Sequence, residues 1–216
     1  MKRNPFGMTM LWRICAFALV ALCLAPHGFG PHAKSTEMPD VDSLAGRILV
    51  AAPGMADPRF AESVILMVRH DVLGAWGVIV NRPIGRKSAA EILSQLSGEP
   101  ADSGAGRDVA IHFGGPVSPL QAVFLHSPDF EGDKTIKLIE GVRLTKSLDL
   151  LHALARGEGP AEVLLVLGYA GWGPGQLEGE LRRKDWFSVK AGAGLLFDGD
   201  MASKWRRALE LQSIDL

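Results

Sequence analysis

Cysteine is scarce in this sequence of 216 residues, and both cysteines, Cys15 and Cys23, lie in one apolar run near the N-terminus. From Met38 onward the chain has none. This absence excludes a structural disulfide, a cysteine-based zinc site and a cysteine nucleophile from the part of the chain that follows Met38. It does not restrict the compartment, because a domain without cysteine tolerates either redox environment.

A large excess of charge of either sign is also absent. The formal net charge is −1; four cations and one anion precede Met38, which leaves 19 Lys and Arg against 23 Asp and Glu in the rest of the chain. A mildly acidic body disfavours general binding of nucleic acid, which depends on clustered cations that neutralise phosphates. The length and the 47% content of hydrophobic residues are typical of a globular protein with a single domain.

The N-terminal apolar run, 14–24, is shorter than the roughly 20 residues that a transmembrane helix needs. Lys2, Arg3 and Arg13 precede the run, and Gly28-x-Gly30 follows it with small residues in the register of a cleavage site. A signal peptide has the same order of a basic start, a short apolar core and a cleavage site. The alternative is a translation start placed too far upstream, with Met38 as the true start. Residues 1–37 are therefore interpreted as a signal-like segment or an extension, and 44–216 as the folded domain. The first alternative implies an exported or membrane-associated protein, and the second a cytoplasmic one.

Short apolar runs recur along the rest of the chain. Several are apolar on both alternating faces, as in strands buried on both sides of a sheet. Helical patterns lie between them, including Ser88-x-x-Glu91, which is a capping box, and a helix with Pro174 as its first residue. The order is not a regular βαβ alternation, so we predict an α+β fold, a single domain with a mixed, strongly curved, barrel-like sheet flanked by helices. The predicted strands are 48–52, 63–68, 76–80, 109–113, 123–126, 135–140 and 163–167.

The stretch 168–178, GYAGWGPGQLE, is the most unusual part of the sequence. It follows an expected strand and opens an expected helix, the setting in which glycine-rich turns bind anions on free backbone N–H groups. The alternative is a tight turn anchored by Tyr169 and Trp172. Arg59 is a further anion-binding candidate, because a guanidinium group matches the shape of a carboxylate. Asn81-Arg82-Pro83 ends an expected strand, a position where ligand-binding groups are often placed. The candidate ligand-binding residues are Arg82, His112, Gly171, Gly173, Gly175 and Gln176.

His112 and His126 are the residues that a metal site or a general base would use. A zinc site would need a third ligand, and Asp129 or His70 could supply it only if the fold brought one of them close. The string His126-Ser127-Pro128-Asp129 contains the residue types of a hydrolase triad, but neighbours on one turn do not adopt triad geometry. We therefore predict no catalytic residue, no metal ligand and no cofactor.

Five sequence blocks occur in the order seen in the YqgE/AlgH family, which this chain resembles over about 44–190. The resemblance implies an α+β fold with a barrel-like sheet and helices on its outside. Members of that family are often labelled transcriptional regulators, without an assigned reaction, and they normally begin close before the first strand. The blocks are Pro53-Gly54-Met55-x-Asp57-Pro58-x-Phe60, Asn81-Arg82-Pro83, His112-Phe113-Gly114-Gly115-Pro116-Val117, Leu125-His126-Ser127-Pro128 and Gly168-Tyr169-Ala170-Gly171-Trp172-Gly173-x-Gly175-Gln176-Leu177-Glu178.

The sequence leaves three functional hypotheses open. The leading one is a non-enzymatic ligand-binding or regulatory module, with a small-molecule or anionic ligand bound by the 168–178 turn with Arg82 and His112 nearby, or with a protein partner. The second is a regulator linked to nucleic acid, which the charge disfavours. The third is an enzyme that uses His112 or His126 as a general base. Contact with a membrane is expected only through residues 1–37.

Overall fold

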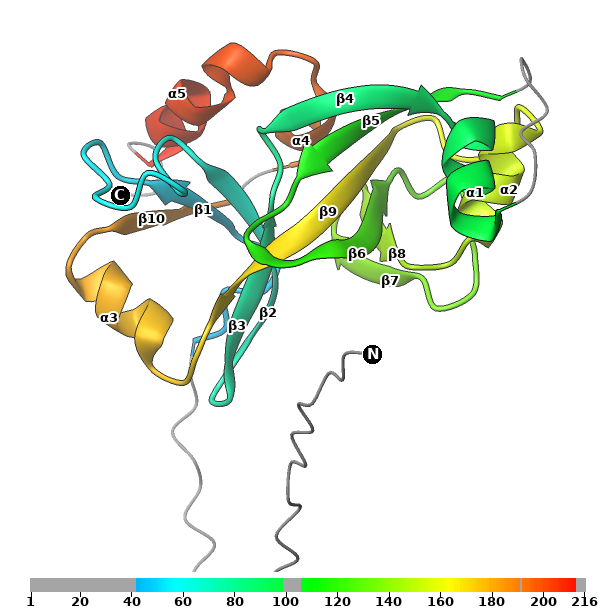
Figure 1. Cartoon of the computed structure of the whole chain (residues 1–216). Helices are drawn as coiled ribbons and strands as arrows, with labels where there is room; N and C mark the ends of the chain where they lie inside the picture. Colours follow the sequence, from blue (N-terminus) through cyan, green and yellow to red (C-terminus); the bar gives the residue numbers. More distant parts are fainter. Residues whose placement is uncertain (1–41, 99–105, 191, 213–216) are drawn as a thin grey trace, which may run out of the picture. The chain divides into compact units, whose positions relative to one another are not determined.

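The computed structural model describes residues 42–98, 106–190 and 192–212, which belong to one compact unit, Glu37–Leu216 (Figure 1). The predictions for residues 1–37 lie outside the described residues. Among the described residues, no helix combines the length and the apolar character needed to cross a membrane.

The described part of the chain forms ten strands and five helices. The strands are β1 (Ile48–Ala51), β2 (Val64–Asp71), β3 (Gly74–Ile79), β4 (Pro83–Ser88), β5 (Asp108–Phe113), β6 (Val117–His126), β7 (Ile136–Ile139), β8 (Val142–Thr145), β9 (Val163–Trp172) and β10 (Trp186–Val189). The helices are α1 (Ala89–Ser97), α2 (Asp149–Ala155), α3 (Gln176–Arg182), α4 (Ala193–Phe197) and α5 (Met201–Leu211).

All ten strands belong to one curled sheet in the order β10-β1-β2-β3-β9-β6-β8-β7, with β5 on β9 and β4 on β5. Only the β5–β9 pair is parallel among the described ladders, so the sheet is mixed. Strand β9 runs through the middle of Figure 1 and joins the two halves of the sheet. Its first half pairs with β5 and β6, and its second half pairs with β3. The predicted fold class is confirmed.

The apolar runs are buried on both faces, which explains why they do not alternate with polar residues. Strand β1 shows this most simply. Ile48 and Val50 pack in a core cluster that α4 and α5 cover, whereas Leu49 and Ala51 pack in a second cluster that includes Leu177 of α3. A third cluster lies between the β5–β9–β6 face and helices α1 and α2. The Trp205 indole N–H donates to the carbonyl of Ala51 at 2.8 Å and ties α5 to β1.

The capping box is present at the start of α1. Ser88 Oγ accepts from the backbone N–H of Glu91, and the Glu91 carboxylate accepts from the backbone N–H of Ser88. The prediction for α3 was wrong by two residues, because Gly175 adopts a left-handed conformation (φ 72°) and the helix begins at Gln176 instead of Pro174. Strands β4, β8 and β10 and helix α4 were not predicted. β8, β10 and α4 have only four or five residues, and β4 is a largely exposed edge strand.

Candidate functional site

A pocket of about 380 Å³ lies between the loop before β2 and the segment that runs from β9 through α3 to β10. Three of the sequence blocks that resemble the family contribute to its walls, although they are far apart in the sequence. The lining residues are Met55, Ala56, Asp57, Arg59, Phe60, Pro116, Val117, Gly171, Trp172, Gln176, Glu180, Arg183, Asp185 and Trp186.

Aromatic rings form one wall of this pocket. Phe60 packs edge-on against Trp186 with a centroid distance of 5.8 Å, and Trp172 packs edge-on against Trp186 at 6.0 Å. Trp172 and Trp186 are 7% and 3% exposed, so the wall is a continuation of the core and not a set of mobile surface rings. Edge-to-face pairs of this kind contribute about 0.5–1.5 kcal/mol each beyond the area that they bury.

The carboxylate of Glu180 holds the polar side of the pocket together. Its Oε2 accepts from the indole N–H groups of Trp172 (2.7 Å) and Trp186 (2.8 Å), and its Oε1 accepts from Gln176 Nε2 (2.9 Å). The side-chain oxygen of Gln176, Oε1, in turn accepts from the backbone N–H of Gly173 at 3.1 Å. One chain of hydrogen bonds therefore fixes the turn, the helix and both indole rings.

Two ion pairs that include lining residues complete the site. Arg59 and Asp57 pair at 2.7 Å on one side, and Arg183 and Asp185 pair at 2.7 Å on the other. The hydrogen bond from the Arg59 side chain lowers the pKa of Asp57, so this carboxylate is ionised at neutral pH. The side chains of Arg59 and Arg183 are about two-thirds exposed, at 65% and 63%, and therefore remain accessible to a ligand.

The Asn81-Arg82 pair lies behind the pocket wall and holds its loop in place. Arg82 donates to the carbonyls of Arg59 and Ala61. Asn81 accepts from the N–H of Val64 and donates to the carbonyl of Glu62. Arg82, a predicted ligand-binding residue, thus contacts the back of the loop through the backbone carbonyls of Arg59 and Ala61 and does not line the pocket.

His112 is also separate from the pocket. The residue is 1% exposed, and its Nδ1 lies 2.9 Å from the carbonyl of Val80. His126 is fully buried, and its Nδ1 lies 2.7 Å from the carbonyl of Ser127. Burial lowers the pKa of both histidines, so both rings are neutral at neutral pH. Among the described residues, no group of three His, Cys, Asp or Glu side chains is placed to hold a metal ion.

The structure therefore brings together only part of the predicted set. Gly171 and Gln176 line the pocket, and Gly173 and Gly175 lie in the same turn. The N–H of Gly173 is already bonded to Gln176, so the turn does not present it as a free anion-binding group. Sequence reasoning missed Trp186, Glu180, Arg183 and Asp185. The dense charged residues between 178 and 185 were the available signal, but the sequence does not show that they return to the 53–60 loop.

Comparisons with known proteins place the chain in a well-populated group. A family model described as AlgH-like matches residues 48–216. A UPF0301 protein of Cereibacter sphaeroides is 43% identical over 173 residues, which is 80% of this chain and 93% of that protein. A UPF0301 protein of Paracoccus denitrificans is 40% identical over 181 residues, which is 82% of this chain and 94% of that protein.

Two solved structures are similar to this fold. The solution structure of the AlgH protein from Pseudomonas aeruginosa has a TM-score of 0.67 and 34% identity, and the match covers 84% of this chain and 92% of that one. A crystal structure of a Corynebacterium diphtheriae protein has a TM-score of 0.59 at 23% identity, covers 76% of this chain and 85% of that one, and supports the fold alone.

Proposed function

Because the chain belongs to the AlgH-like family, whose matched members carry names that state no reaction, we propose that it is a non-catalytic binding module for a small zwitterionic ligand. The observation that carries the proposal is the pocket in which the 53–60 loop, the start of β6 and the 171–186 segment meet. Its volume of about 380 Å³ lies in the usual range for small-molecule sites, roughly 300–1,000 Å³.

The charges at the pocket favour a ligand that carries both signs. Asp57–Arg59 and Arg183–Asp185 each offer one cation and one anion, and the Glu180 carboxylate already accepts hydrogen bonds from three N–H donors. A ligand carboxylate meets a guanidinium group, and a ligand ammonium meets an aspartate. An amino acid or a short peptide with a flat or apolar side chain matches these charged groups and the aromatic wall of Phe60, Trp172 and Trp186.

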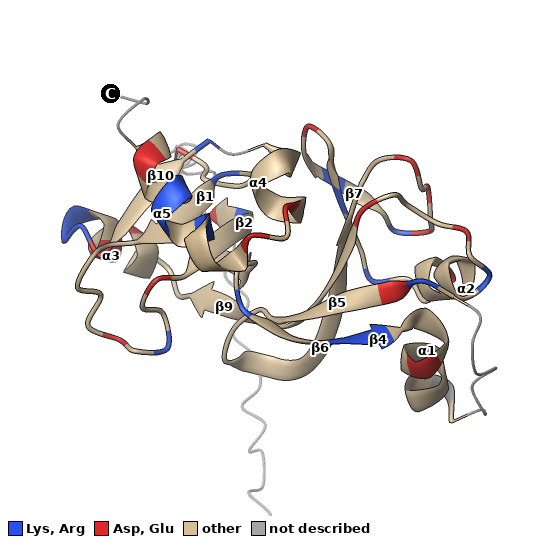
Figure 2. Cartoon of the chain, turned by 90° about the horizontal axis from the view of Figure 1, so that it is seen from above, with Lys and Arg blue, Asp and Glu red and all other residues tan. Residues whose placement is uncertain are grey.

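The placement of the histidines disfavours the enzymatic alternative. A general base must lie within hydrogen-bonding reach of the proton that it removes. His112 and His126 are buried, and neither lines this pocket. The basic and acidic residues are interspersed over the elements (Figure 2), so the proposal also does not include nucleic acid.

The test is isothermal titration calorimetry, in which the full chain is titrated with amino acids and dipeptides that carry aromatic or aliphatic side chains. We expect at least one to bind, and we expect Arg59→Gln and Arg183→Gln each to weaken that binding about tenfold. Arg156→Gln is the matched control, because Arg156 forms the same kind of ion pair with Glu158, two residues along the chain, and does not line the pocket. Binding that survives both pocket variants, or no binding across the panel, would refute the proposal.

A further inference from the structure

A second and larger hollow, of about 540 Å³, lies on the sheet face next to α1. We call it the α1 groove, and its walls come from β4, α1, β5, β6, β9 and the 146–148 segment. It shares no lining residue with the pocket described above.

The groove exists because two short helices cover only part of an apolar sheet face. Helices α1 and α2 pack over Phe124 and Leu165, which pair across β6 and β9. The same face continues to the next pair, Ala122 and Leu167, which is only partly buried and lines the groove. Apolar sheet surface thus continues past the edge of α1 into solvent.

Exposed apolar side chains gather at this groove. Seven large hydrophobic side chains of the described residues are exposed, and four of them line it: Ile84 (58%), Leu96 (57%), Leu120 (93%) and Leu148 (44%). Single exposed hydrophobic residues are ordinary, whereas a contiguous group of them beside a hollow is typical of an interaction site.

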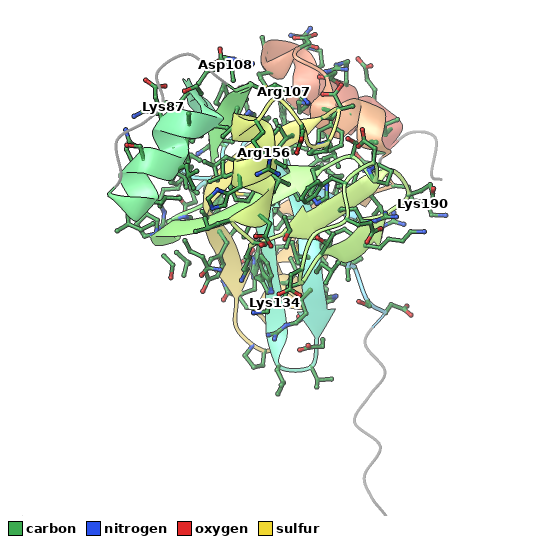
Figure 3. All side chains as sticks on the ribbon, turned by 90° about the vertical axis from the view of Figure 1, so that its right-hand side faces the viewer. Lys87, Arg107, Asp108, Lys134, Arg156 and Lys190 are labelled. Atoms are coloured by element: carbon green, nitrogen blue, oxygen red, sulfur yellow. The ribbon has the colours of Figure 1, made fainter. Side chains whose placement is uncertain are left out.

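The charged residues that line the groove are all basic. Arg86 and Lys87 lie on β4 and Lys146 follows β8, while no Asp or Glu is among the lining residues. Figure 2 shows the basic stretch of β4 next to α1. Figure 3 labels Lys87, which lies near the end of β4 that leads into α1. Within the described ranges, neither Arg86 nor Lys87 forms an ion pair, and the Lys146 ammonium group lies 5.7 Å from the ring centroid of Trp76.

From these observations we infer that the α1 groove docks an amphipathic α-helix of another protein, with apolar side chains in the groove and acidic side chains against Arg86, Lys87 and Lys146. Charge complementarity selects the acidic partner. A helix presents apolar anchors along one face, which matches a groove bounded by apolar side chains. The exposure of Leu120 and Ile84 favours a partner larger than a single acyl chain, because their side chains project from the walls into solvent.

The same charges disfavour three other occupants. A two-fold contact between copies of this chain would bring Arg86 and Lys87 close to their own counterparts. The apolar run 14–24 follows Lys2, Arg3 and Arg13, which carry the same sign as the groove. An added β-strand at the free edge of β4 would meet a register irregularity between Pro83 and Gly85, followed by two cations.

A pair of synthetic peptides tests the inference in solution. Both are 18-residue amphipathic helices with the same leucine face, and the polar face is glutamate in one and lysine in the other. We expect the full chain to bind the glutamate peptide in a salt-dependent manner and to bind the lysine peptide at least about tenfold more weakly. Leu120→Ser, and Arg86→Glu with Lys87→Glu, should each weaken binding of the glutamate peptide about tenfold.

The controls preserve the same chemistry away from the groove. Leu73→Ser removes another exposed leucine, in the β2–β3 turn, and Arg182→Glu with Arg206→Glu gives the same change in net charge. Both controls should bind like the parent chain. Equal binding of the two peptides, equal loss in the controls, or no binding of either peptide would overturn the inference.

Photo-crosslinking in the protein's own host identifies the natural occupant. A photoreactive phenylalanine analogue is placed at position 120 of the full chain, with position 73 as the control. We expect crosslinks specific to position 120 that map to an acidic, amphipathic segment of a different protein. Mapping to a second copy, to residues 1–37 or to a lipid, or the absence of any crosslink specific to position 120, would contradict the inference.

Discussion

The indole N–H of Trp172 donates a 2.7 Å hydrogen bond to Oε2 of Glu180, and the same oxygen accepts from Trp186 at 2.8 Å. Trp172 ends β9, Glu180 lies in α3 and Trp186 begins β10. One carboxylate therefore joins three consecutive elements and fixes the wall of the candidate pocket.

Removal of this carboxylate should destabilise the fold. Glu180→Ala leaves two largely buried indole N–H groups without their acceptor, and hydrogen bonds to a charged group contribute about 1.5–3 kcal/mol each. We expect a loss of about 3 kcal/mol in the free energy of unfolding, measured by urea denaturation, and a smaller loss for Glu180→Gln. Glu158→Ala, which removes only a surface ion pair, should cost less than about 1 kcal/mol. Equal effects of the alanine variants would show that Glu180 has no special role.

Replacement by alanine should destabilise the protein at Gly168 and have little effect at Gly173. Gly168 has φ 74°, and a Cβ there would lie 2.4 Å from the carbonyl oxygen of Gly115. Left-handed strain and overpacking together predict a loss of about 3 kcal/mol for Gly168→Ala. A Cβ on Gly173 would meet nothing closer than Gln176 Oε1 at 3.9 Å, so Gly173→Ala should change stability by less than about 0.5 kcal/mol. Thermal denaturation of the two variants distinguishes these outcomes.

This contrast also shows which part of the glycine pattern the sequence could explain. Gly168 lies within β9 and not in the predicted turn, and glycine is required there because β9 passes close to the Gly114-Gly115 turn. Gly171 is exposed, and Gly173 has room for a side chain, so packing alone does not account for glycine at position 173. Spacing in a sequence does not reveal which of several glycines another strand approaches.

Much of the fold was predictable because local signals determine it. The runs that became β1, β2, β3 and β9 are apolar on both faces, and the Ser88 capping box marks the start of α1. Strands β4 and β10 are stabilised by pairing with distant strands, and their own residues give a weak signal. The pocket was only partly predicted because it also depends on contacts between residues that are distant in the sequence, such as Phe60 and Trp186.

The stability of the protein should fall as pH decreases from 7 to 5. Burial lowers the pKa of His112 and His126 from the ordinary value of 6.5, so the unfolded chain takes up protons first as pH falls through 6.5. The two neutral histidines make their full contribution to the free energy of unfolding above pH 6.5. This contribution is lost as the pH falls from 6.5 towards the lowered pKa of each histidine in the folded state. Asp129 and Asp198, whose pKa values are lowered from 3.8, act at lower pH.

The two histidines account for this dependence if His112→Asn with His126→Asn flattens the profile between pH 5 and 7. Urea midpoints at several pH values provide the measurement, each normalised to the same variant at pH 7.5. His152→Asn is the control, because His152 is exposed on α2. A double variant whose profile remains as steep as that of the parent chain would assign the pH dependence to other groups.

The buried lysine of α5 should be essential for packing of the C-terminal helices. The Lys204 side chain is 0% exposed; its ammonium group donates to the carbonyls of Leu195, Leu196 and Asp198 and pairs with the Asp198 carboxylate at 3.0 Å. Lys204→Met leaves those carbonyls without their donor and should cost about 3 kcal/mol. Arg206→Met, on the exposed side of the same helix, should be close to neutral in the same denaturation assay.

The most direct test of the binding-module account is native mass spectrometry of the full chain purified from its own host. We predict a mass excess in the range of an amino acid or short peptide, which disappears on denaturation. It should be absent when Arg59 and Arg183 are both replaced by glutamine and present in Arg156→Gln. A bare polypeptide, or an adduct that persists in the double variant, would contradict the assignment of the pocket as the ligand site.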